Sequence, residues 1–328
     1  EERTGGFAFT RGSQSERRPR HEPSREKERE KIEHKFKMQA VEVSPFNKDV
    51  FKGKVVAVTG GSSGIGLEIA RQFGAHGAAI AICGRRRQPI DDALAAFASE
   101  GIRAFGATCD VRKPDQAIAF IKSVVQEFGH LDVLVNSAAG NFLCPAEDLS
   151  VNGFKTVMEI DAVGVFNMSK AAFEALKGHG TIINISATLH YGASWFQVHA
   201  SAAKAAIDSI TRTLGMEWGS EGIRAVGVAP GPVGGTAGMT KLAPGMEGMV
   251  EKLVPLKRMA TKWEIAMSCL FLATPGAGYI TGETLVVDGG SWLNTGLTPP
   301  IPKDMIRKAS RAIEAKSRKT GLAAKSKL

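Results

Sequence analysis

The stretch KVVAVTGGSSGIGLEIARQFG at residues 54–74 decides the fold of this 328-residue chain. Its apolar start, 54–60, predicts a buried β-strand, and the apolar residues after it recur at helical spacing. The glycines between have the pattern TGxxxGxG, which turns a strand tightly into a helix and offers backbone N–H groups to a pyrophosphate. This context favours a ligand site over a turn without a ligand. The predicted cofactor-binding residues here are Gly60, Ser62, Ser63, Gly64, Ile65 and Gly66.

The same alternation of strand and helix continues along the chain. Further strands are expected at 78–84, 102–111, 131–140, 181–186, 223–231 and 283–290. Helical stretches lie between them, among them 152–177 and 200–218. Strands that alternate with helices of this length form right-handed βαβ units. We therefore predict an α/β fold with a doubly wound parallel sheet, the Rossmann fold, in a single domain.

Charge and cysteine usage exclude several classes of function. The formal net charge is +9, but residues 38–300 hold 22 basic and 23 acidic side chains, so the excess lies at the two ends. A nucleic-acid groove on the body is therefore not expected. Apolar runs stay short of the roughly 18 residues of a membrane span. The four cysteines form no CxxC, so we expect neither a metal site nor a disulfide framework, and a reducing compartment.

The residues after the second expected strand indicate which dinucleotide binds. An NAD site places a carboxylate there, whereas a 2′-phosphate requires arginine. The sequence is CGRRR, with Arg85 and Arg86 at the decisive positions, so we predict NADPH rather than a solvated basic turn. Asp110, followed by Val111, ends the third strand. It is a candidate for binding the adenine amino group and is equally compatible with a turn.

With NSAAG at 136–140, a helical lysine at Lys204 and APG at 229–231, the chain resembles the short-chain dehydrogenase/reductase family over about 50–292. The resemblance implies a seven-stranded sheet and a homo-oligomer, a tetramer or a dimer. It also implies that Lys204 binds the nicotinamide ribose, that Asn136 closes the adenine side, and that the nicotinamide is flanked by Pro230 and Gly231.

Three positions depart from the family pattern. The family's proton donor is a tyrosine four residues before the lysine, on the same helix face, and Ala200 occupies that position. The partner serine falls at Ala187, and the usual asparagine of the long helix is Asp161. A catalytically silent NADPH-binding subunit would also lose the tyrosine and serine. A reductase of carbon–carbon double bonds loses them for a chemical reason, because its proton must reach a carbon.

The residues around these departures resemble the peroxisomal 2,4-dienoyl-CoA reductases over roughly 45–295, notably NSAAGNFLCPAEDLSVNGFKTVMEID, QVHASAAKAA and VVDGGSWL. That resemblance implies NADPH-dependent reduction of a 2,4-dienoyl-CoA to a trans-3-enoyl-CoA. Lys204 would polarise the thioester, and Asp161 and Asp288 would orient a proton-donating water. For Asp288 a turn role competes, since DGG is common across the larger family. A related enoyl or ketoacyl thioester reductase stays open as an alternative.

Other segments give weaker expectations about the substrate and the domain limits. Candidates for the acyl channel are Asn141 and Phe142, with core packing the alternative for the phenylalanine. We expect a disordered N-terminal extension at 1–44, an NADPH-binding domain at 45–295 and a basic C-terminal extension at 296–328. The domain would include a methionine-rich substrate lid at 232–262, and a native start at Met38 is expected.

The chain ends in Ser326, Lys327 and Leu328, the tripeptide that a peroxisomal import receptor reads. The sequence therefore predicts a peroxisomal matrix protein. This prediction agrees with a fatty acyl-CoA substrate, because peroxisomes degrade unsaturated fatty acyl chains.

Overall fold

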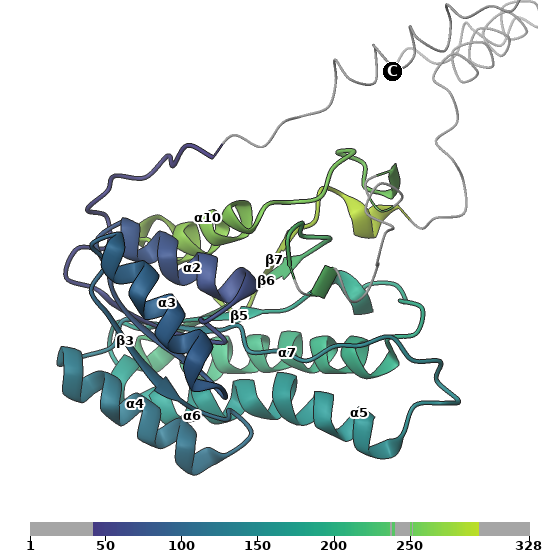
Figure 1. The fold of residues 1–328 in the computed structure, drawn as a ribbon, viewed down its shortest axis with the longest axis horizontal. Helices are drawn as coiled ribbons and strands as arrows, with labels where there is room; N and C mark the ends of the chain where they lie inside the picture. Colours follow the sequence, from purple (N-terminus) through teal and green to yellow (C-terminus); the bar gives the residue numbers. More distant parts are fainter. Residues whose placement is uncertain (1–41, 237, 240–249, 251, 295–328) are drawn as a thin grey trace, which may run out of the picture. The chain divides into compact units, whose positions relative to one another are not determined.

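The computed structural model describes residues 42–236, 238, 239, 250 and 252–294. Over these residues it contains a seven-stranded parallel sheet with strand order β3-β2-β1-β4-β5-β6-β7 (Figure 1). The chain order reverses between β1 and β4, which creates the crevice where such sheets bind ligands. The doubly wound α/β prediction is confirmed. The strands are β1 Val55–Thr59, β2 Ala79–Gly84, β3 Ala104–Thr108, β4 Val133–Asn136, β5 Thr181–Ile185, β6 Arg224–Pro230 and β7 Thr284–Val287.

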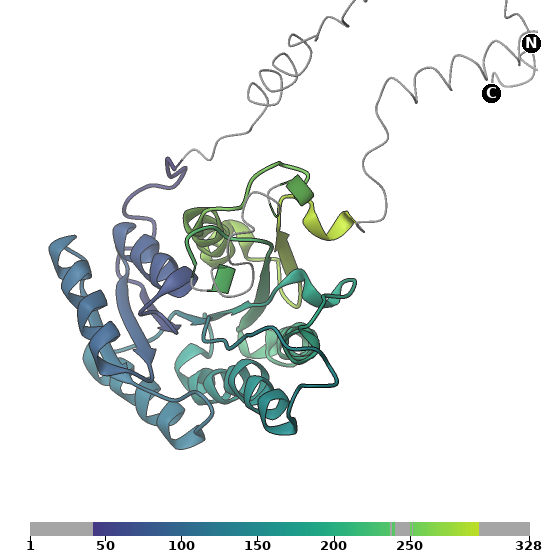
Figure 2. The ribbon, with the colours of Figure 1, turned by 45° about the vertical axis from the view of Figure 1, so that its right-hand side comes forward.

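Helices cover both faces of the sheet. Helices α2, α3 and α10 pack on one face, and α4, α6 and α7 pack on the other (Figures 1 and 2). Along β1, Val56 and Val58 point into the first core while Val55 and Ala57 point into the second. A strand buried on both faces requires this uninterrupted apolar run. The helices are α2 Gly64–Ala75, α3 Arg87–Ser99, α4 Pro114–Phe128, α5 Val151–Met158, α6 Gly164–Leu176, α7 Val198–Glu217 and α10 Lys262–Ala273.

The long helix expected at 152–177 differs from the prediction at its centre. Between α5 and α6 the chain forms a π-helical turn, η1 Glu159–Val163, which carries Asp161. A π turn inserts an extra residue into the helix and rotates the side chains that follow. Gly164 ends the turn, and a Cβ there would lie 2.6 Å from Val111 Cγ2, so only glycine allows this close approach.

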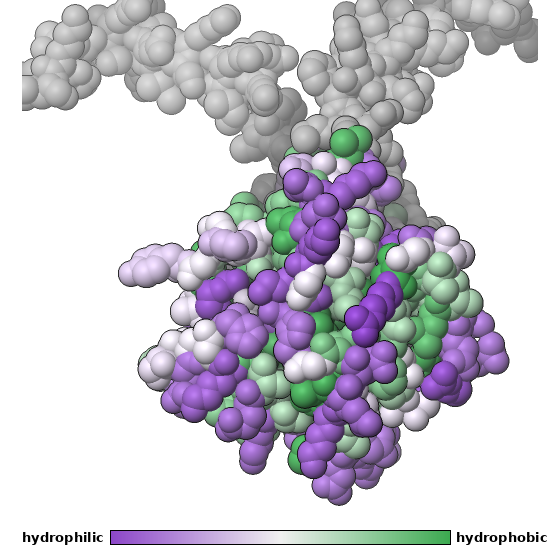
Figure 3. Space-filling model, turned by 90° about the vertical axis from the view of Figure 1, so that its left-hand side faces the viewer, coloured by the Kyte–Doolittle hydropathy of each residue, from purple (hydrophilic) through white to green (hydrophobic). Residues whose placement is uncertain are grey.

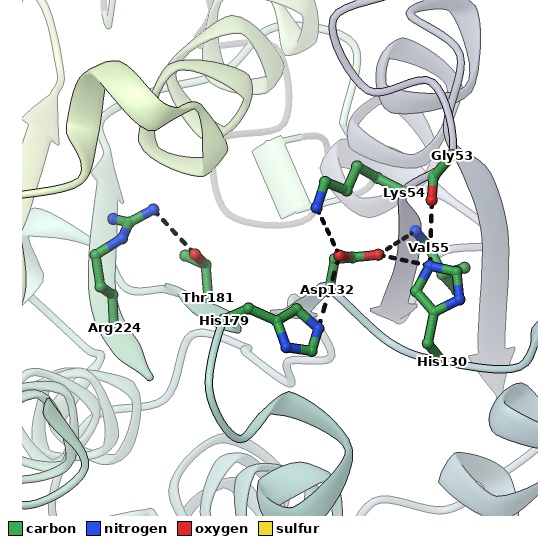
Figure 4. A network of polar contacts seen from close by, with 8 residues as sticks. All are labelled: Gly53, Lys54, Val55, His130, Asp132, His179, Thr181 and Arg224. Carbon is green, nitrogen blue, oxygen red and sulfur yellow. Dashed lines mark hydrogen bonds and ion pairs between the residues drawn. The ribbon is translucent and has the colours of Figure 1, made fainter. Parts of the chain in front are cut away.

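Near the amino ends of the central strands, Asp132 forms a buried polar network (Figure 4). Its carboxylate accepts hydrogen bonds from Lys54 Nζ at 2.9 Å and from the Val55 backbone N–H at 2.8 Å. His130 Nε2 lies 3.0 Å and His179 Nε2 3.7 Å from the same carboxylate. One carboxylate thereby links the starts of β1, β4 and β5.

The segment 232–262, expected to be a lid, returns to its starting point. Val233 and Ala260 form a parallel bridge, and Gly234 N donates to Ala260 O at 2.9 Å. Residues 237, 240–249 and 251 of the expected lid lie outside the described part of the chain. The expected C-terminal extension, 296–328, and all but the last three residues of the expected N-terminal extension, 1–44, lie there too, whereas Ser44 contacts His76 at 2.7 Å.

The described helices and one face of the molecule show how apolar side chains are distributed. Within the described ranges, the helices are too short or too polar to cross a bilayer. On the face in Figure 3, hydrophilic side chains are spread between small apolar patches. Such a mixture is ordinary for a protein surface in water.

Candidate functional site

The turn after β1 has the shape of a phosphate cradle. Gly60 adopts φ +66°, and a Cβ there would lie 3.0 Å from Ala138 Cα. A Cβ on Gly66 would lie 2.6 Å from the Gly60 carbonyl oxygen, so helix α2 packs directly against the turn. Gly64 begins α2 with φ +60°. These glycines bring the N-terminus of α2 to the carboxyl edge of the sheet, where its N–H groups favour an anion.

Three other predicted residues complete this turn. Ser63 is the N-cap of α2 in an extended conformation, yet its hydroxyl makes no capping bond, so it is available to a ligand. Ser62 lies over the end of β2, since a Cβ on Gly84 would come within 3.3 Å of its hydroxyl. Ile65, the second residue of α2, packs against the core. The residues that would hold a pyrophosphate therefore lie together.

The end of β2 carries positive charge without a carboxylate. Arg85 and Arg86 are exposed directly after Gly84, and neither forms an ion pair with an acidic residue that the structure describes, although the Arg85 charge helps to lower the pKa of Asp110. Arg87, by contrast, binds Asp91 through two hydrogen bonds. Two unpaired guanidinium groups beside the phosphate cradle fit a nicotinamide dinucleotide, and they would suit an additional phosphate on its ribose.

Asp110 is held by a neighbour that the sequence argument did not consider. Its carboxylate accepts two hydrogen bonds from Arg112 Nε, at 2.9 and 3.1 Å, and one from Nη2. These bonds lower the pKa of Asp110, so the group is an anion at neutral pH. Val111 is buried, and its carbonyl accepts from Asn167 Nδ2 at 2.9 Å. Asp110 thus follows β3 as a carboxylate already paired with Arg112.

Asn136, at the end of β4, points into the protein. Its Nδ2 donates to Asn184 Oδ1 at 2.9 Å and to Ser169 Oγ at 3.2 Å. The following turn is held by Thr59, whose hydroxyl oxygen accepts from the backbone N–H groups of Ser137 and Ala138. The Asn136 side chain therefore positions β4, and the backbone of the NSAAG turn forms the wall of the crevice.

Asp161 and Lys204 form a buried ion pair at the centre of the crevice. Asp161 Oδ2 lies 3.1 Å from Lys204 Nζ, and the two side chains are 1% and 10% exposed. Asp161 Oδ1 accepts from the Gly140 N–H at 2.7 Å. Lys204 Nζ also donates to the Ile185 carbonyl at 3.1 Å. An ammonium has three N–H donors, so one is left to point at a ligand.

The tyrosine position is filled by a small buried side chain. Ala200 is 1% exposed and lies one turn before Lys204 on α7. Tyr191 packs on Trp292, and burial together with the Asp208 charge raises its pKa to about 12. A phenol held neutral in this way is a poor acid at neutral pH. Asp161 and Lys204 are therefore the titratable pair of the crevice.

Asp288 follows β7 and holds a turn. Its two carboxylate oxygens accept from the backbone N–H groups of Gly290 at 2.8 Å and Trp292 at 2.7 Å. The preceding strand lies beside the PG turn, because Gly231 N donates to Val287 O at 3.1 Å. A Cβ on Gly231 would lie 2.6 Å from Asp288 Cβ. Pro230, Gly231 and Asp288 therefore meet at one edge of the crevice, with the carboxylate already bonded.

The candidate acyl-channel residues lie just beyond Gly140. Asn141 Nδ2 donates to Gln197 Oε1 at 2.7 Å. Phe142 is 39% exposed and stacks on His199 with ring centroids 4.3 Å apart, so it is not a core residue. Burial lowers the pKa of His199, against smaller opposing effects of Phe142 and Asp161. The imidazole is therefore neutral and forms a wall of the site.

Sequence reasoning missed the groups that hold the ion pair in place. They are the N–H of Gly140 and the carbonyl of Ile185, which belong to the backbone and leave no mark in side-chain patterns. The π turn that aims Asp161 has no sequence signal of its own either. Gln197 stands between the glycine-rich and lysine-bearing motifs, and only its bond to Asn141 reveals it.

A family model described as enoyl-(acyl carrier protein) reductase matches residues 60–291. A solved short-chain dehydrogenase from Bacillus anthracis is 38% identical, with a TM-score of 0.69, over 76% of this chain and 100% of that one. The chain belongs to the short-chain dehydrogenase/reductase family. Membership implies a nicotinamide cofactor, NADH or NADPH, and the glycine turn, α2 and Lys204 fit one.

Two other members indicate where in the family the chain stands. It is 53% identical to a protein of Arabidopsis thaliana named peroxisomal 2,4-dienoyl-CoA reductase [(3E)-enoyl-CoA-producing], over 84% of this chain and 96% of that protein. An actinorhodin polyketide ketoreductase solved with NADPH is 30% identical, with a TM-score of 0.69, over 77% of this chain and 99% of that one. Of these two proteins, the dienoyl-CoA reductase is more similar to the chain than the ketoreductase is, at 53% against 30% identity.

Proposed function

We propose that this protein is an NADPH-dependent 2,4-dienoyl-CoA reductase that forms (3E)-enoyl-CoA. The observation that carries the proposal is the Asp161–Lys204 pair, 3.1 Å apart beside Ala200. A carbonyl reductase needs an acid that protonates oxygen, and the position where the family has this acid is occupied by Ala200. A carboxylate beside an ammonium instead suits a reaction that develops charge on an oxygen and places its proton on a carbon.

The proposed reaction begins with charge stabilisation. When bound, NADPH supplies a hydride to the δ carbon of the dienoyl group. Electrons then move through the conjugated system, and negative charge develops on the thioester oxygen. The remaining N–H of Lys204 is placed to stabilise this charge, because Ile185 and Asp161 hold the ammonium from two other sides. To bind a ribose hydroxyl as well, the same ammonium would exchange its bond to Ile185 or to Asp161, because it has three N–H donors.

Protonation completes the reaction. The dienolate takes a proton at the α carbon, which leaves the double bond between the β and γ carbons. Asp161 has lone pairs beyond those used by Gly140 and Lys204, and can therefore orient a water toward that carbon. Both donors to Asp288 are backbone N–H groups of its own turn, Gly290 and Trp292, so we assign it to positioning the edge of the crevice rather than to proton delivery.

The cofactor preference rests on the residues after β2. Arg85 and Arg86 are exposed and without an acidic partner among the described residues, whereas a carboxylate would be required to select NADH. A 2′-phosphate would accept charge-assisted hydrogen bonds from either guanidinium. We therefore assign NADPH, with Asp110 and Val111 at the adenine end.

We further propose a peroxisomal matrix location and a homo-oligomer, a tetramer or a dimer. The location is supported by the Ser326–Lys327–Leu328 terminus, which lies outside the described residues, and by the word peroxisomal in the relative's name. Removal of the tripeptide from an N-terminally tagged chain should shift it from peroxisomes to the cytosol under fluorescence microscopy. Unchanged import would contradict the assignment.

The deciding experiment is NADPH consumption with 2,4-hexadienoyl-CoA, compared with crotonyl-CoA and acetoacetyl-CoA. We expect turnover of the dienoyl thioester alone, with a 3-enoyl product identified by mass spectrometry and NMR. Turnover of crotonyl-CoA or acetoacetyl-CoA instead would indicate an enoyl or ketoacyl thioester reductase. NADPH binding without any turnover would indicate a catalytically silent subunit.

A further inference from the structure

A second hollow lies beside the Asp161–Lys204 pair. It has a volume of about 250 Å³ and is lined by Cys144 and Ala146 from the loop after β4 and by residues 193–198 from the loop after β5 and the first residue of α7. Both loops leave the carboxyl ends of their strands, the edge that carries the site (Figure 1). The lining is mainly apolar and includes Cys144, Trp195, Phe196 and Val198. We call it the loop pocket.

Hydrogen bonds join the loop pocket to the ion pair. Gly140 binds Asp161 at 2.7 Å, and the next residue, Asn141, binds Gln197 at 2.7 Å. Gln197 itself lines the loop pocket. The two sites are therefore neighbours along one continuous wall, and a ligand that reaches Lys204 with one end can enter the pocket with the other.

The pocket exposes large apolar side chains that a protein surface normally buries. Trp195 is 84% exposed, and Phe196 and Val198 are about half exposed. Phe196 adopts φ +60°, a left-handed conformation that is unfavourable for a bulky side chain. Its carbonyl accepts from the Cys144 N–H at 2.9 Å, which helps to hold this conformation. Strain and exposed aromatic surface that persist together indicate a binding role.

We propose that the loop pocket receives the distal acyl chain of the substrate and sets the preference for chain length. The inference rests on the proposed function for the identity of the ligand, a fatty acyl thioester. An acyl chain is the occupant that matches a mainly apolar hollow joined to the Asp161–Lys204 pair through Gln197, Asn141 and Gly140. Trp195 and Val198 are the specificity-determining side chains, because they line the pocket without contributing to the Asp161–Lys204 pair.

The proposal gives a quantitative expectation. Each methylene that leaves water for an apolar site improves binding by about fourfold. A decadienoyl chain exceeds a hexadienoyl chain by four methylenes. Partial burial should therefore raise kcat/KM by tenfold or more, as an order of magnitude. Without the pocket, the two substrates should be used almost equally well.

The test compares three variants with both 2,4-hexadienoyl-CoA and 2,4-decadienoyl-CoA. Trp195→Ala should remove most of the preference for the longer chain and leave hexadienoyl turnover within about twofold. Val198→Asp should do the same, and it should not disturb the fold, because an acidic residue is favourable in the first turn of α7. The matched control is Tyr279→Ala, a fully exposed aromatic residue that precedes the amino end of β7.

Calorimetric binding of saturated butanoyl-CoA and dodecanoyl-CoA separates this inference from the proposed reaction. If the enzyme turns over neither dienoyl substrate, the proposed function fails. The pocket is still supported if Trp195→Ala abolishes the gain in affinity for dodecanoyl-CoA. A length dependence that survives in both pocket variants would overturn the inference. A second result would also overturn it: Trp195→Ala keeps the length dependence but changes the molar mass measured by light scattering. The pocket would then be a contact between copies of this chain.

Discussion

Two carboxylates are buried near opposite ends of the same sheet, and they have different surroundings. Asp132, near the amino ends, receives hydrogen bonds from Lys54 and Val55 and lies beside His130 and His179 (Figure 4). Asp161, near the carboxyl ends, has one backbone donor and one ammonium. Each carboxylate thus receives one ammonium and one backbone N–H, and Asp132 has two imidazoles beside it in addition. A carboxylate with spare lone pairs beside a polarising cation is available for chemistry.

The difference follows from the direction of parallel strands. At the amino ends, β1, β4 and β5 begin close together, and a single side chain can link all three. At the carboxyl ends, the chain diverges from β1 and β4 toward opposite faces, which leaves a crevice. Burial alone therefore does not distinguish a catalytic carboxylate from a structural one. The edge of the sheet on which it lies does, because ligands bind at the carboxyl ends of parallel strands.

The largest effect should come from Asp161→Asn. The amide keeps an acceptor for Gly140 but cannot orient a proton-donating water as a carboxylate does. We expect kcat to fall by about 10²–10³-fold, the usual range for loss of general acid–base catalysis. NADPH affinity, measured by fluorescence titration, should change by less than about threefold. Normal turnover by this variant would refute the role given to Asp161.

The matched substitution near the amino ends of the strands is Asp132→Asn. Replacement of the carboxylate leaves the Lys54 ammonium without its counter-charge and removes one of two acceptors. We expect the free energy of unfolding to fall by about 2–3 kcal/mol, as for other charge-assisted hydrogen bonds. For a domain of this size, Tm should drop by roughly 4–10 °C in calorimetry. The comparison would fail if kcat fell as strongly here as in Asp161→Asn.

The double variant Arg85→Ser, Arg86→Ser tests the cofactor assignment without touching either carboxylate. Loss of charge-assisted bonds to a 2′-phosphate should weaken NADPH by about 10–30-fold. NADH, which lacks that phosphate, should be affected by less than about twofold. The ratio of kcat/KM for the two cofactors provides the measurement. Arg87→Ser is the matched control, because Arg87 already binds Asp91.

The smallest effect concerns a partly buried ion pair near the base of segment 232–262. Arg258 binds Glu264 at 2.6 and 2.8 Å, and these bonds lower the pKa of the Glu264 carboxyl. A lowered folded-state pKa adds stability above the unfolded value of about 4.3, and that stability disappears as pH falls through the folded value. Arg258→Met should therefore cost about 1 kcal/mol at pH 7. In denaturation curves below about pH 4, the variant and the parent should converge.

Much of the fold was predictable because it depends on periodicity. Seven apolar runs separated by helical stretches admit few arrangements, and the glycine spacing after Thr59 places the cofactor turn at the end of the first strand. Arg85, Arg86 and Lys204 were also identifiable, since each stands at a fixed offset from a strand end or motif. Helix ends differed little: 200–218 was expected, and Val198–Glu217 is observed.

The predicted roles of single residues were harder to derive. Asp161 could be predicted as a site residue from its position in the sequence. The orientation of its carboxylate, however, depends on the π turn and on the bond to Gly140. Phe142 was open between core packing and the acyl channel, and its exposed stacking on His199 excludes the core. Asp288 was open between catalysis and a turn, and its two backbone bonds favour the turn.

The sequence by itself determined the doubly wound α/β fold class and the dinucleotide-binding turn. It also determined that an alanine, Ala200, stands where the family has its tyrosine. These features are local, since each depends on residues within a few positions of one another. The tertiary structure decided which buried groups share a hydrogen bond. Asp161 and Lys204 are 3.1 Å apart although they are far apart along the chain, and Asp132 gathers residues from three strand starts. Such partnerships depend on how the chain packs, and packing is set by all the residues of both cores at once.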